Sequence, residues 1–112
     1  MNILFACIEF KSYTGMPMYI YELSRRYVQL GHKVSIVALE VGDEITDRAR
    51  ANGVDVYSFK EMPQIKPDVL HLNEYEPSYL SVVAWPRVPA VATVHSQYPC
   101  EQPFNHPNIK RY

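Results

Sequence analysis

The chain has no excess of either charge and very little cysteine. Its 112 residues carry 11 Lys and Arg and 12 Asp and Glu. This near-neutral balance argues against nucleic acid as a partner. The two cysteines, Cys7 in an apolar run and Cys100 in a Pro-rich segment, do not suggest a disulfide framework. No apolar run approaches the ~20 residues of a membrane span, and no basic leader precedes the first run, so we expect a cytoplasmic protein.

Several motifs that would indicate a particular chemistry are also missing. The loop after the first apolar run contains one glycine, Gly15, where a dinucleotide fingerprint needs three, and it lacks the Gly-Lys-Ser/Thr ending of a Walker loop. There is no Cys-x-x-Cys, no His-x-x-x-His and no acidic loop of the calcium-binding type. A serine nucleophile elbow is absent too. We therefore expect no metal site and no cofactor.

Residues 1–37 have the pattern of a strand, a helix and a second strand. The first stretch, Met-Asn-Ile-Leu-Phe-Ala-Cys-Ile, is a nearly unbroken apolar run, as expected for a strand covered on both faces. A helical run follows from Pro17, with Thr14 or Gly15 as its cap and Gly31 as its left-handed C-terminal cap. Its apolar face comprises Ile20, Leu23, Tyr27 and Leu30. This unit is a crossover between parallel strands.

The rest of the chain alternates short apolar runs with helical segments. Further strands are expected at residues 34–39, 54–59, 68–72 and 90–94. A helix at 43–52 should have Asp43 as its cap, Ile45 and Ala49 inside, and Gly53 at its end. Another, from about residue 76, should face the core with Leu80, Val83 and Ala84. The alternation predicts an α/β domain: a three-layer, Rossmann-like parallel sheet of order 3-2-1-4-5.

The link from Lys60 to Pro67 tests that order. Its eight residues reach roughly 26 Å when extended. In the proposed sheet it must cross three strand spacings and the length of a strand, a diagonal of roughly 22 Å. An extended link spans this distance and a helical one falls short, so we predict no regular helix of two or more turns between the third and fourth strands.

The residues that follow His95 differ in kind, since they hold three prolines and no helical or strand period. We therefore assign residues 1–96 to the domain and 97–112 to an irregular tail. A sheet that ended at the fifth strand would leave a hydrophobic edge and one poorly covered face. The sequence leaves three ways to cover them: the tail, a second chain such as another copy, or a longer protein of which these residues are a part.

Polar side chains gather in three loops that should meet near the switch point of the sheet, where ligands of such folds bind. The loops are residues 9–16, 73–77 and 95–98. The helix start at Gly15 either holds a phosphate or sugar hydroxyl on its free N–H groups or is an ordinary cap. Lys11 and Tyr13 could assist a ligand there, and Glu74 could bind a hydroxyl.

The histidines differ in their expected roles. His95 closes the fifth strand, where it could donate a hydrogen bond or act as a general acid or base, or be satisfied by backbone. His71 lies in mid-strand, and we expect it to be a buried, hydrogen-bonded core residue. His32 follows a helix C-terminus, where a cation is favourable, and we expect it to be structural.

Several short motifs follow one another in the order and spacing of an enzyme family. After Gly15 come Tyr-Glu-Leu-Ser-Arg at residues 21–25 and Leu-Gly-His-Lys-Val at 30–34. Lys-Pro-Asp-Val-Leu-His at 66–71 and Pro-Ala-Val-Ala-Thr-Val-His at 89–95 complete the set. Together they resemble the N-terminal domain of GT-B fold retaining glycosyltransferases of family 4 (glycosyl transferases group 1, mannosyltransferase-like), over residues 1–96.

The resemblance implies the acceptor-binding part of a hexosyltransferase that takes sugar from a nucleotide-sugar. The family binds that donor mostly with a second half, whose motif these residues lack, so the chain alone should be inactive. His95 would touch the transferred sugar as the catalytic residue. The substrate-binding residues would be Gly15, Met16, Asn73, Glu74 and Ser96. Met16 replaces the family's second loop glycine, and Asn73 replaces a frequent second histidine.

Other interpretations remain open at this point. The chain could be a stand-alone α/β module without catalysis that binds a nucleotide or a partner protein, or forms homo-oligomers, through an exposed sheet edge. A receiver-like domain fits less well, because only Glu9 follows the first strand as an acidic residue and no lysine follows the fifth. The acceptor is either soluble or lipid-linked, and a lipid-linked acceptor would place the protein at the inner face of the membrane.

Overall fold

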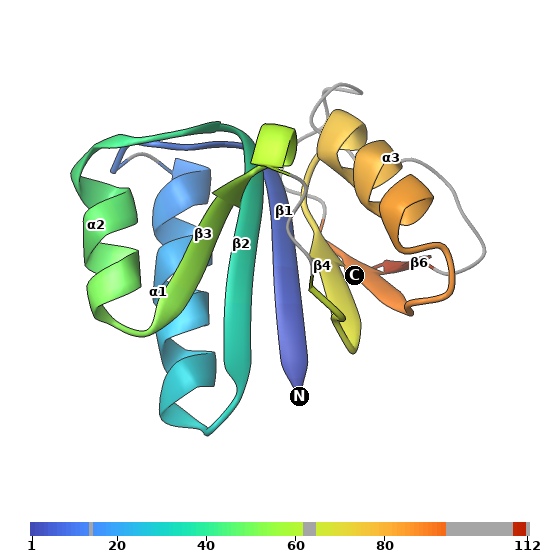
Figure 1. Cartoon of the computed structure of the whole chain (residues 1–112), viewed down its shortest axis with the longest axis horizontal. Helices are drawn as coiled ribbons and strands as arrows, with labels where there is room; N and C mark the ends of the chain where they lie inside the picture. Colours follow the sequence, from blue (N-terminus) through green and yellow to red (C-terminus); the bar gives the residue numbers. More distant parts are fainter. Residues whose placement is uncertain (14, 62–64, 94–108, 112) are drawn as a thin grey trace.

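The computed structural model describes residues 1–13, 15–61, 65–93 and 109–111. These residues form one sheet in the order β3-β2-β1-β4-β5-β6, and every neighbouring pair is parallel (Figure 1). The predicted α/β fold and the order 3-2-1-4-5 are confirmed. The strands are β1 (Asn2–Phe10), β2 (Lys33–Val41), β3 (Val54–Ser58), β4 (Val69–Leu72), β5 (Ala90–Ala92) and β6 (Ile109–Arg111).

The sixth strand corrects the prediction for the tail. β6 pairs with β5, with Ile109 opposite Ala90. Residues 109–111 are therefore not irregular, and the sheet does not end at its fifth strand. Residues 97–108 and 112 lie outside the described residues, as does Val94 at the predicted end of that strand, and the boundary at residue 96 stays a prediction. Of the three ways to cover the edge of β5, the structure shows the first, because the tail supplies the next strand.

Helices cover the sheet on both faces and make three layers (Figure 1). On one face α1 (Gly15–Gln29) and α2 (Asp43–Ala51) pack on β1, β2 and β3 around Phe5, Ile20 and Ile36. On the other, α3 (Tyr75–Ala84) and the 3-10 turn η1 (Phe59–Glu61) pack around Leu4 and Leu70. Successive β1 residues enter opposite cores because strand side chains alternate. Each large side chain buried this way contributes about 1.5–3 kcal/mol.

The first helix confirms most of its predicted apolar face. Ile20 is fully buried, and Leu23 and Tyr27 are half-buried against the core. Leu30 is 72% exposed, so its predicted inward position was wrong, because the helix ends at Gln29 and Leu30 lies in the turn. The predicted cap at Gly31 is confirmed: its φ is 93° and its N–H donates to Val28 O, while His32 N–H donates to Tyr27 O. These two bonds form a Schellman motif.

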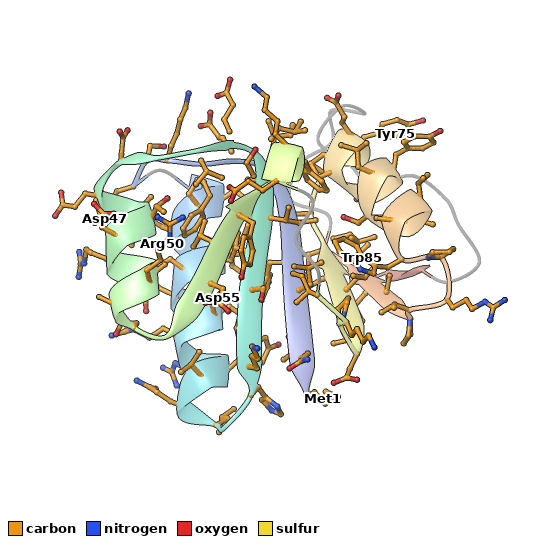
Figure 2. The ribbon with its side chains drawn as sticks, in the orientation of Figure 1. Met1, Asp47, Arg50, Asp55, Tyr75 and Trp85 are labelled. Atoms are coloured by element: carbon orange, nitrogen blue, oxygen red, sulfur yellow. The ribbon has the colours of Figure 1, made fainter. Side chains whose placement is uncertain are left out.

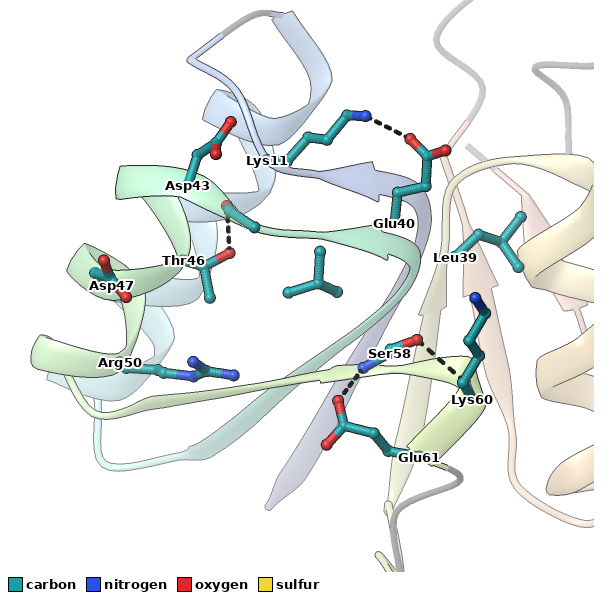
Figure 3. A pocket seen from close by; sticks show the side chains of 12 residues that line it. Lys11, Leu39, Glu40, Asp43, Thr46, Asp47, Arg50, Ser58, Lys60 and Glu61 are labelled. Carbon is teal, nitrogen blue, oxygen red and sulfur yellow. Dashed lines mark hydrogen bonds and ion pairs between the residues drawn. The ribbon is translucent and has the colours of Figure 1, made fainter.

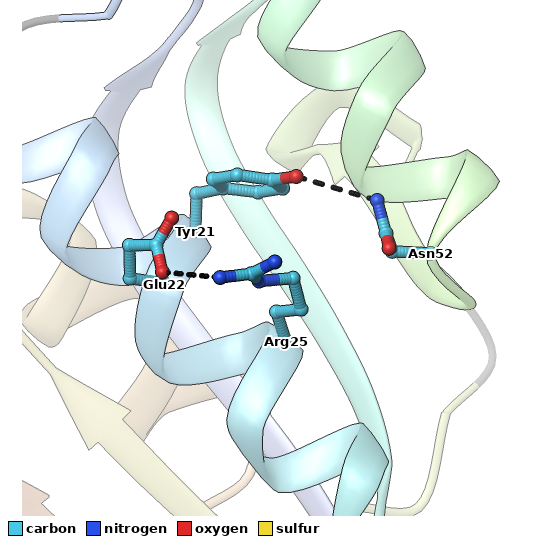
Figure 4. A network of polar contacts seen from close by, with 4 residues as sticks. All are labelled: Tyr21, Glu22, Arg25 and Asn52. Atoms are coloured by element: carbon cyan, nitrogen blue, oxygen red, sulfur yellow. Dashed lines mark hydrogen bonds and ion pairs between the residues drawn. The ribbon is translucent and has the colours of Figure 1, made fainter.

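Side chains also join α1 to α2. Asn52 donates to the hydroxyl of Tyr21 at 3.3 Å, and the guanidinium of Arg48 lies 5.7 Å from the Tyr21 ring. On the same ring, Arg25 approaches to 6.0 Å and is held by Glu22 at 2.8 Å (Figure 4). Because Tyr21 is only 3% exposed, these polar groups close the outer end of the first core.

The second helix begins differently from the prediction. Asp43 is its first residue and has a φ of 61°, while Gly42 takes the cap position without a side-chain bond. The anchor is Thr46, whose buried hydroxyl lies 2.8 Å from Gly42 O and 3.0 Å from Phe10 O. Ile45 and Ala49 are fully buried as predicted, and Gly53 follows the helix with a φ of 84°. Sequence periodicity therefore identified the inner face of α2 but not its first turn.

The inner face predicted for the third helix is confirmed only in part. Leu80 is half-buried and packs against the second core, but Val83 is 62% exposed, and the buried residues include Ser78, Ser81 and Val82. Small side chains on this face suit a close approach to the sheet. Ser78 satisfies its hydroxyl by donating to the carbonyl of Glu74.

The link between β3 and β4 contains no helix of two turns among its described residues. Lys60 and Glu61 belong to the single turn η1, and residues 65–67 have no regular structure. Trp85, at the end of α3, donates from Nε1 to Ile65 O at 3.2 Å and ties the link to that face (Figure 2). The described part of the link thus agrees with the length argument for the strand order.

Cys7 is buried in the first core, as predicted, and is fully shielded from solvent. Burial, with smaller effects from the negative charges of Glu74 and Glu9, raises the pKa of its thiol far above the usual value. Iodoacetamide should therefore leave Cys7 unmodified in the native chain at alkaline pH and label it in concentrated guanidinium chloride. Peptide mapping separates Cys7 from Cys100.

The same burial predicts a pH dependence of stability. Above about pH 8.5 the thiol ionises only in the unfolded chain, so unfolding becomes easier as the pH rises further. Cys7→Ala should lose this part of the slope relative to the unmodified chain in chemical denaturation. Equal slopes for the two proteins, or equal labelling of Cys7 before and after unfolding, would show that the thiol is not shielded.

Candidate functional site

The carboxyl ends of the parallel strands lie at one edge of the sheet, and the strand order reverses there between β1 and β4. β1 pairs with β2 as far as Phe10 and Val41, but with β4 only as far as Ala6 and Leu72. The last residues of β1 therefore extend beyond β4. This step in the edge is the switch point at which ligands of such sheets bind.

Glu74 fills this step. Its carboxylate accepts the N–H of Ile8 at 2.7 Å, in the position that a further residue of β4 would have occupied, and the residue is 8% exposed. The neighbouring Asn73 is fully buried and donates from Nδ2 to Ala6 O at 3.1 Å and to His71 O at 3.3 Å. Both predicted site residues thus hold backbone together, and their role in binding substrate stays a prediction.

The start of α1 lies at the same edge as Glu74 (Figure 1). Gly15 is exposed there, and a Cβ atom in its place would meet nothing within 4 Å, so packing among the described residues does not require a glycine. Met16 is half-buried and packs on the first core. His95 and Ser96, the other predicted site residues, lie outside the described residues.

The two histidines within the described residues have the contacts of structural residues. His71 is buried, stacks on Phe5 with ring centroids 4.7 Å apart, and shares a 2.7 Å hydrogen bond with Thr93. This confirms its prediction as a hydrogen-bonded core residue. His32, which follows the helix cap, lies 3.2 Å from the amino group of Met1.

A polar cavity of about 600 Å³ opens at the carboxyl ends of β2 and β3, between α2 and η1 (Figure 3). Its volume is within the range of ligand sites in proteins. The cationic residues of its lining are Lys11, Arg50 and Lys60, and the anionic ones are Glu40, Asp43, Asp47 and Glu61. The cavity therefore presents both signs of charge at the edge where the sheet was expected to bind a ligand.

Four of these side chains are held by partners in the wall. Lys11 and Glu40 form an ion pair of 2.6 Å, and this hydrogen bond raises the pKa of Lys11 and lowers that of Glu40. Glu61 accepts the N–H of Ser58 at 2.9 Å, and Arg50 donates to Val56 O at 2.9 Å. Because the ion pair is half-exposed, we expect it to position the side chains more than to stabilise the fold.

The remaining charged groups face the cavity with no such partner. Within the described residues, the side chains of Asp43, Asp47 and Lys60 form no hydrogen bond or ion pair. Asp43 and Asp47 stand one turn apart on α2, and Lys60 lies on the opposite side (Figure 3). These three groups are available to a ligand.

The sequence interpretation missed this cavity except for Lys11. A signal was present, because Glu40 and Asp43 come at the end of the second strand and Lys60 and Glu61 follow the third. The rule that carboxyl ends share one edge applies to these loops as well. We had restricted the site to the loops beside the switch point. Tyr13, the other suggested helper, contacts Arg48 at 5.7 Å instead.

No group of three or more His, Cys, Asp or Glu side chains among the described residues is placed to hold a metal ion. None of the helices in this part of the chain combines the length and apolar character needed to cross a membrane. No family model matches the chain, and no curated protein or solved structure matches it either. The resemblance described above therefore depends on the motifs alone.

Proposed function

We propose that the chain is the acceptor-binding part of a retaining glycosyltransferase that uses a nucleotide-sugar donor. The proposal starts from the motifs at residues 21–25, 30–34, 66–71 and 89–95. The observation that carries it is the cavity of both charge signs at the carboxyl edge, on the same edge as the start of α1. Mixed charge of this kind suits a hydroxylated acceptor, because hydroxyls both donate and accept hydrogen bonds.

In this proposal the chain binds and orients and performs no covalent chemistry. The free N–H groups at the start of α1 would face the donor phosphates, since a helix N-terminus favours negative charge. The cavity would hold the acceptor beside them, and His95 would contact the transferred sugar. Stabilisation of the departing nucleoside diphosphate would come mostly from cations of a donor-binding domain. In this proposal, transfer therefore requires the acceptor-binding chain and a donor-binding domain together.

The test is a transfer assay on two proteins. The 112-residue chain should release no nucleoside diphosphate from UDP-sugars or GDP-sugars with acceptors present, because it lacks most donor contacts. A two-domain protein, in which the chain is followed by a donor-binding domain, should release it. Turnover by the chain alone would contradict the proposal that most donor contacts come from a second domain. A folded two-domain protein without turnover for any donor and acceptor would reject the function.

The alternative of a stand-alone module that forms homo-oligomers through an exposed sheet edge stays a prediction. The structure changes which edge this concerns, because β6 pairs with β5 and becomes the outer strand on that side. Gel filtration tests the alternative independently of the transfer assay, since a monomer at micromolar concentration would contradict it.

A further inference from the structure

We propose that the cavity between α2 and η1 binds an uncharged polyhydroxy molecule, a sugar or a cyclitol without phosphate. Its role as the acceptor rests on the proposed function, whereas the binding itself does not. The proposal depends on the three groups named above as available: Asp43, Asp47 and Lys60.

The charges of the lining exclude other ligand classes. A sugar phosphate or a nucleotide would bring its negative charge beside the carboxylates of Asp43 and Asp47. Neither carboxylate forms an ion pair with another described residue, although the charge of Asp43 acts on Lys11, which Glu40 already pairs. An apolar ligand would bury these carboxylates without hydrogen bonds, at a cost of several kcal/mol. A hydroxyl avoids both penalties, because it can donate a hydrogen bond to a carboxylate and accept one from an ammonium group.

The arrangement of the walls fits a molecule with hydroxyls on several sides. The carboxylates project from α2, and the ammonium of Lys60 comes from η1 across the cavity (Figure 3). Arg50 and Glu61 are anchored to backbone atoms of β3, and Lys11 is anchored to Glu40, so the walls between them are pre-organised. Pre-organised charged groups lose little entropy when a ligand binds, which favours selective recognition of a small ligand.

The attachment of the cavity walls to the central strand also suits this ligand. Thr46 ties α2 to the end of β1 through Phe10 O, so the carboxylate wall is fixed to the central strand. Lys11, on the loop that follows β1, forms the side of the cavity nearest to the start of α1. A polyhydroxy molecule in the cavity would therefore lie on the edge at which the proposed function places the donor.

The experiment is a titration of the isotope-labelled 112-residue chain with myo-inositol and glucose, followed by amide chemical shifts. Both should give saturable shifts confined to the residues of the cavity walls, at positions 11, 39–47, 50 and 58–61. Asp47→Ala and Lys60→Ala should each weaken binding about tenfold, since each removes a hydrogen bond to a charged group. Asp55→Ala and Lys33→Ala make the same chemical changes at exposed positions that do not line the cavity, and should leave affinity unchanged (Figure 2).

Glucose 6-phosphate is the comparison ligand. It should bind more weakly than glucose, and the difference should shrink in Asp47→Ala because a repelling carboxylate is gone. Tighter binding of the phosphate ester, shifts elsewhere on the protein, or no saturation with either uncharged ligand would overturn the proposal. If the cavity variants of an active two-domain protein transfer sugar with unchanged KM for the acceptor, this inference fails and the proposed function stands. If the polyol binds as described and a folded two-domain protein transfers no sugar, the inference that the cavity binds a polyol stands and the proposed function fails.

Discussion

Phe5→Ala is expected to lower the free energy of unfolding by about 3–5 kcal/mol. Phe5 is fully buried in the central strand, between Ile36 of β2 and His71 of β4. Its ring stacks on His71 at 4.7 Å and on Tyr27 at 6.0 Å, so alanine leaves a large cavity at the junction of sheet and α1. Since small domains are typically stable by about 5–15 kcal/mol, this loss is a large share of the total.

Urea denaturation, followed by circular dichroism, measures this effect. The midpoint should fall while the slope with denaturant stays the same, which identifies a change in stability rather than in compactness. Leu30→Ala is the matched control, because it also truncates an apolar side chain but one that is 72% exposed. We expect a change within about 0.5 kcal/mol for the control. Equal losses in the two variants would show that Phe5 is not in the core.

Glu74→Ala should cost about 1–3 kcal/mol, because it leaves the N–H of Ile8 without its acceptor at a half-buried position. Glu74 is 8% exposed, and its carboxylate joins the end of β4 to β1 across the switch point. Glu74→Gln keeps an acceptor oxygen and should lower the free energy of unfolding by less. Thermal and urea unfolding of the two variants beside the unmodified chain measure the difference.

The control for this prediction is Glu76→Ala, an exposed glutamate in the first turn of the same helix. This variant should lower the free energy of unfolding by less than about 1 kcal/mol, the usual size of a helix-dipole effect. If Glu74→Ala were as stable as the unmodified chain, the carboxylate would not be needed to hold β1. That result would agree with the sequence prediction that Glu74 binds a hydroxyl.

Features that depend on local spacing could be predicted from the sequence. The alternation of apolar runs and helices predicted the parallel sheet and its order, and the length of the link between the third and fourth strands agreed with that order. Gly31 and Gly53 were identified as helix ends, and both have the positive φ that favours glycine. Ile45 and Ala49 were placed inside because they lie four residues apart on one helical face.

Other features depend on neighbours that no local pattern reveals. In α3 the buried residues are Ser78, Ser81 and Val82 rather than Val83, because the space between that helix and the sheet decides which side chains fit. Glu74 became a strand partner because β4 ends four residues before β1 does. Likewise, the strand at residues 109–111 forms only because the edge of β5 offers unpaired backbone groups to it.

The candidate site also depends partly on local sequence and partly on tertiary packing. The sequence by itself determined that polar loops follow the strands and that they share one edge, since this follows from parallel strands. Only the tertiary structure decided that the open volume lies between α2 and η1, with Asp43 and Asp47 across from Lys60. The position of a cavity depends on how segments distant in the sequence pack together. Residues 43 and 60 line one cavity only because β2 and β3 pair side by side.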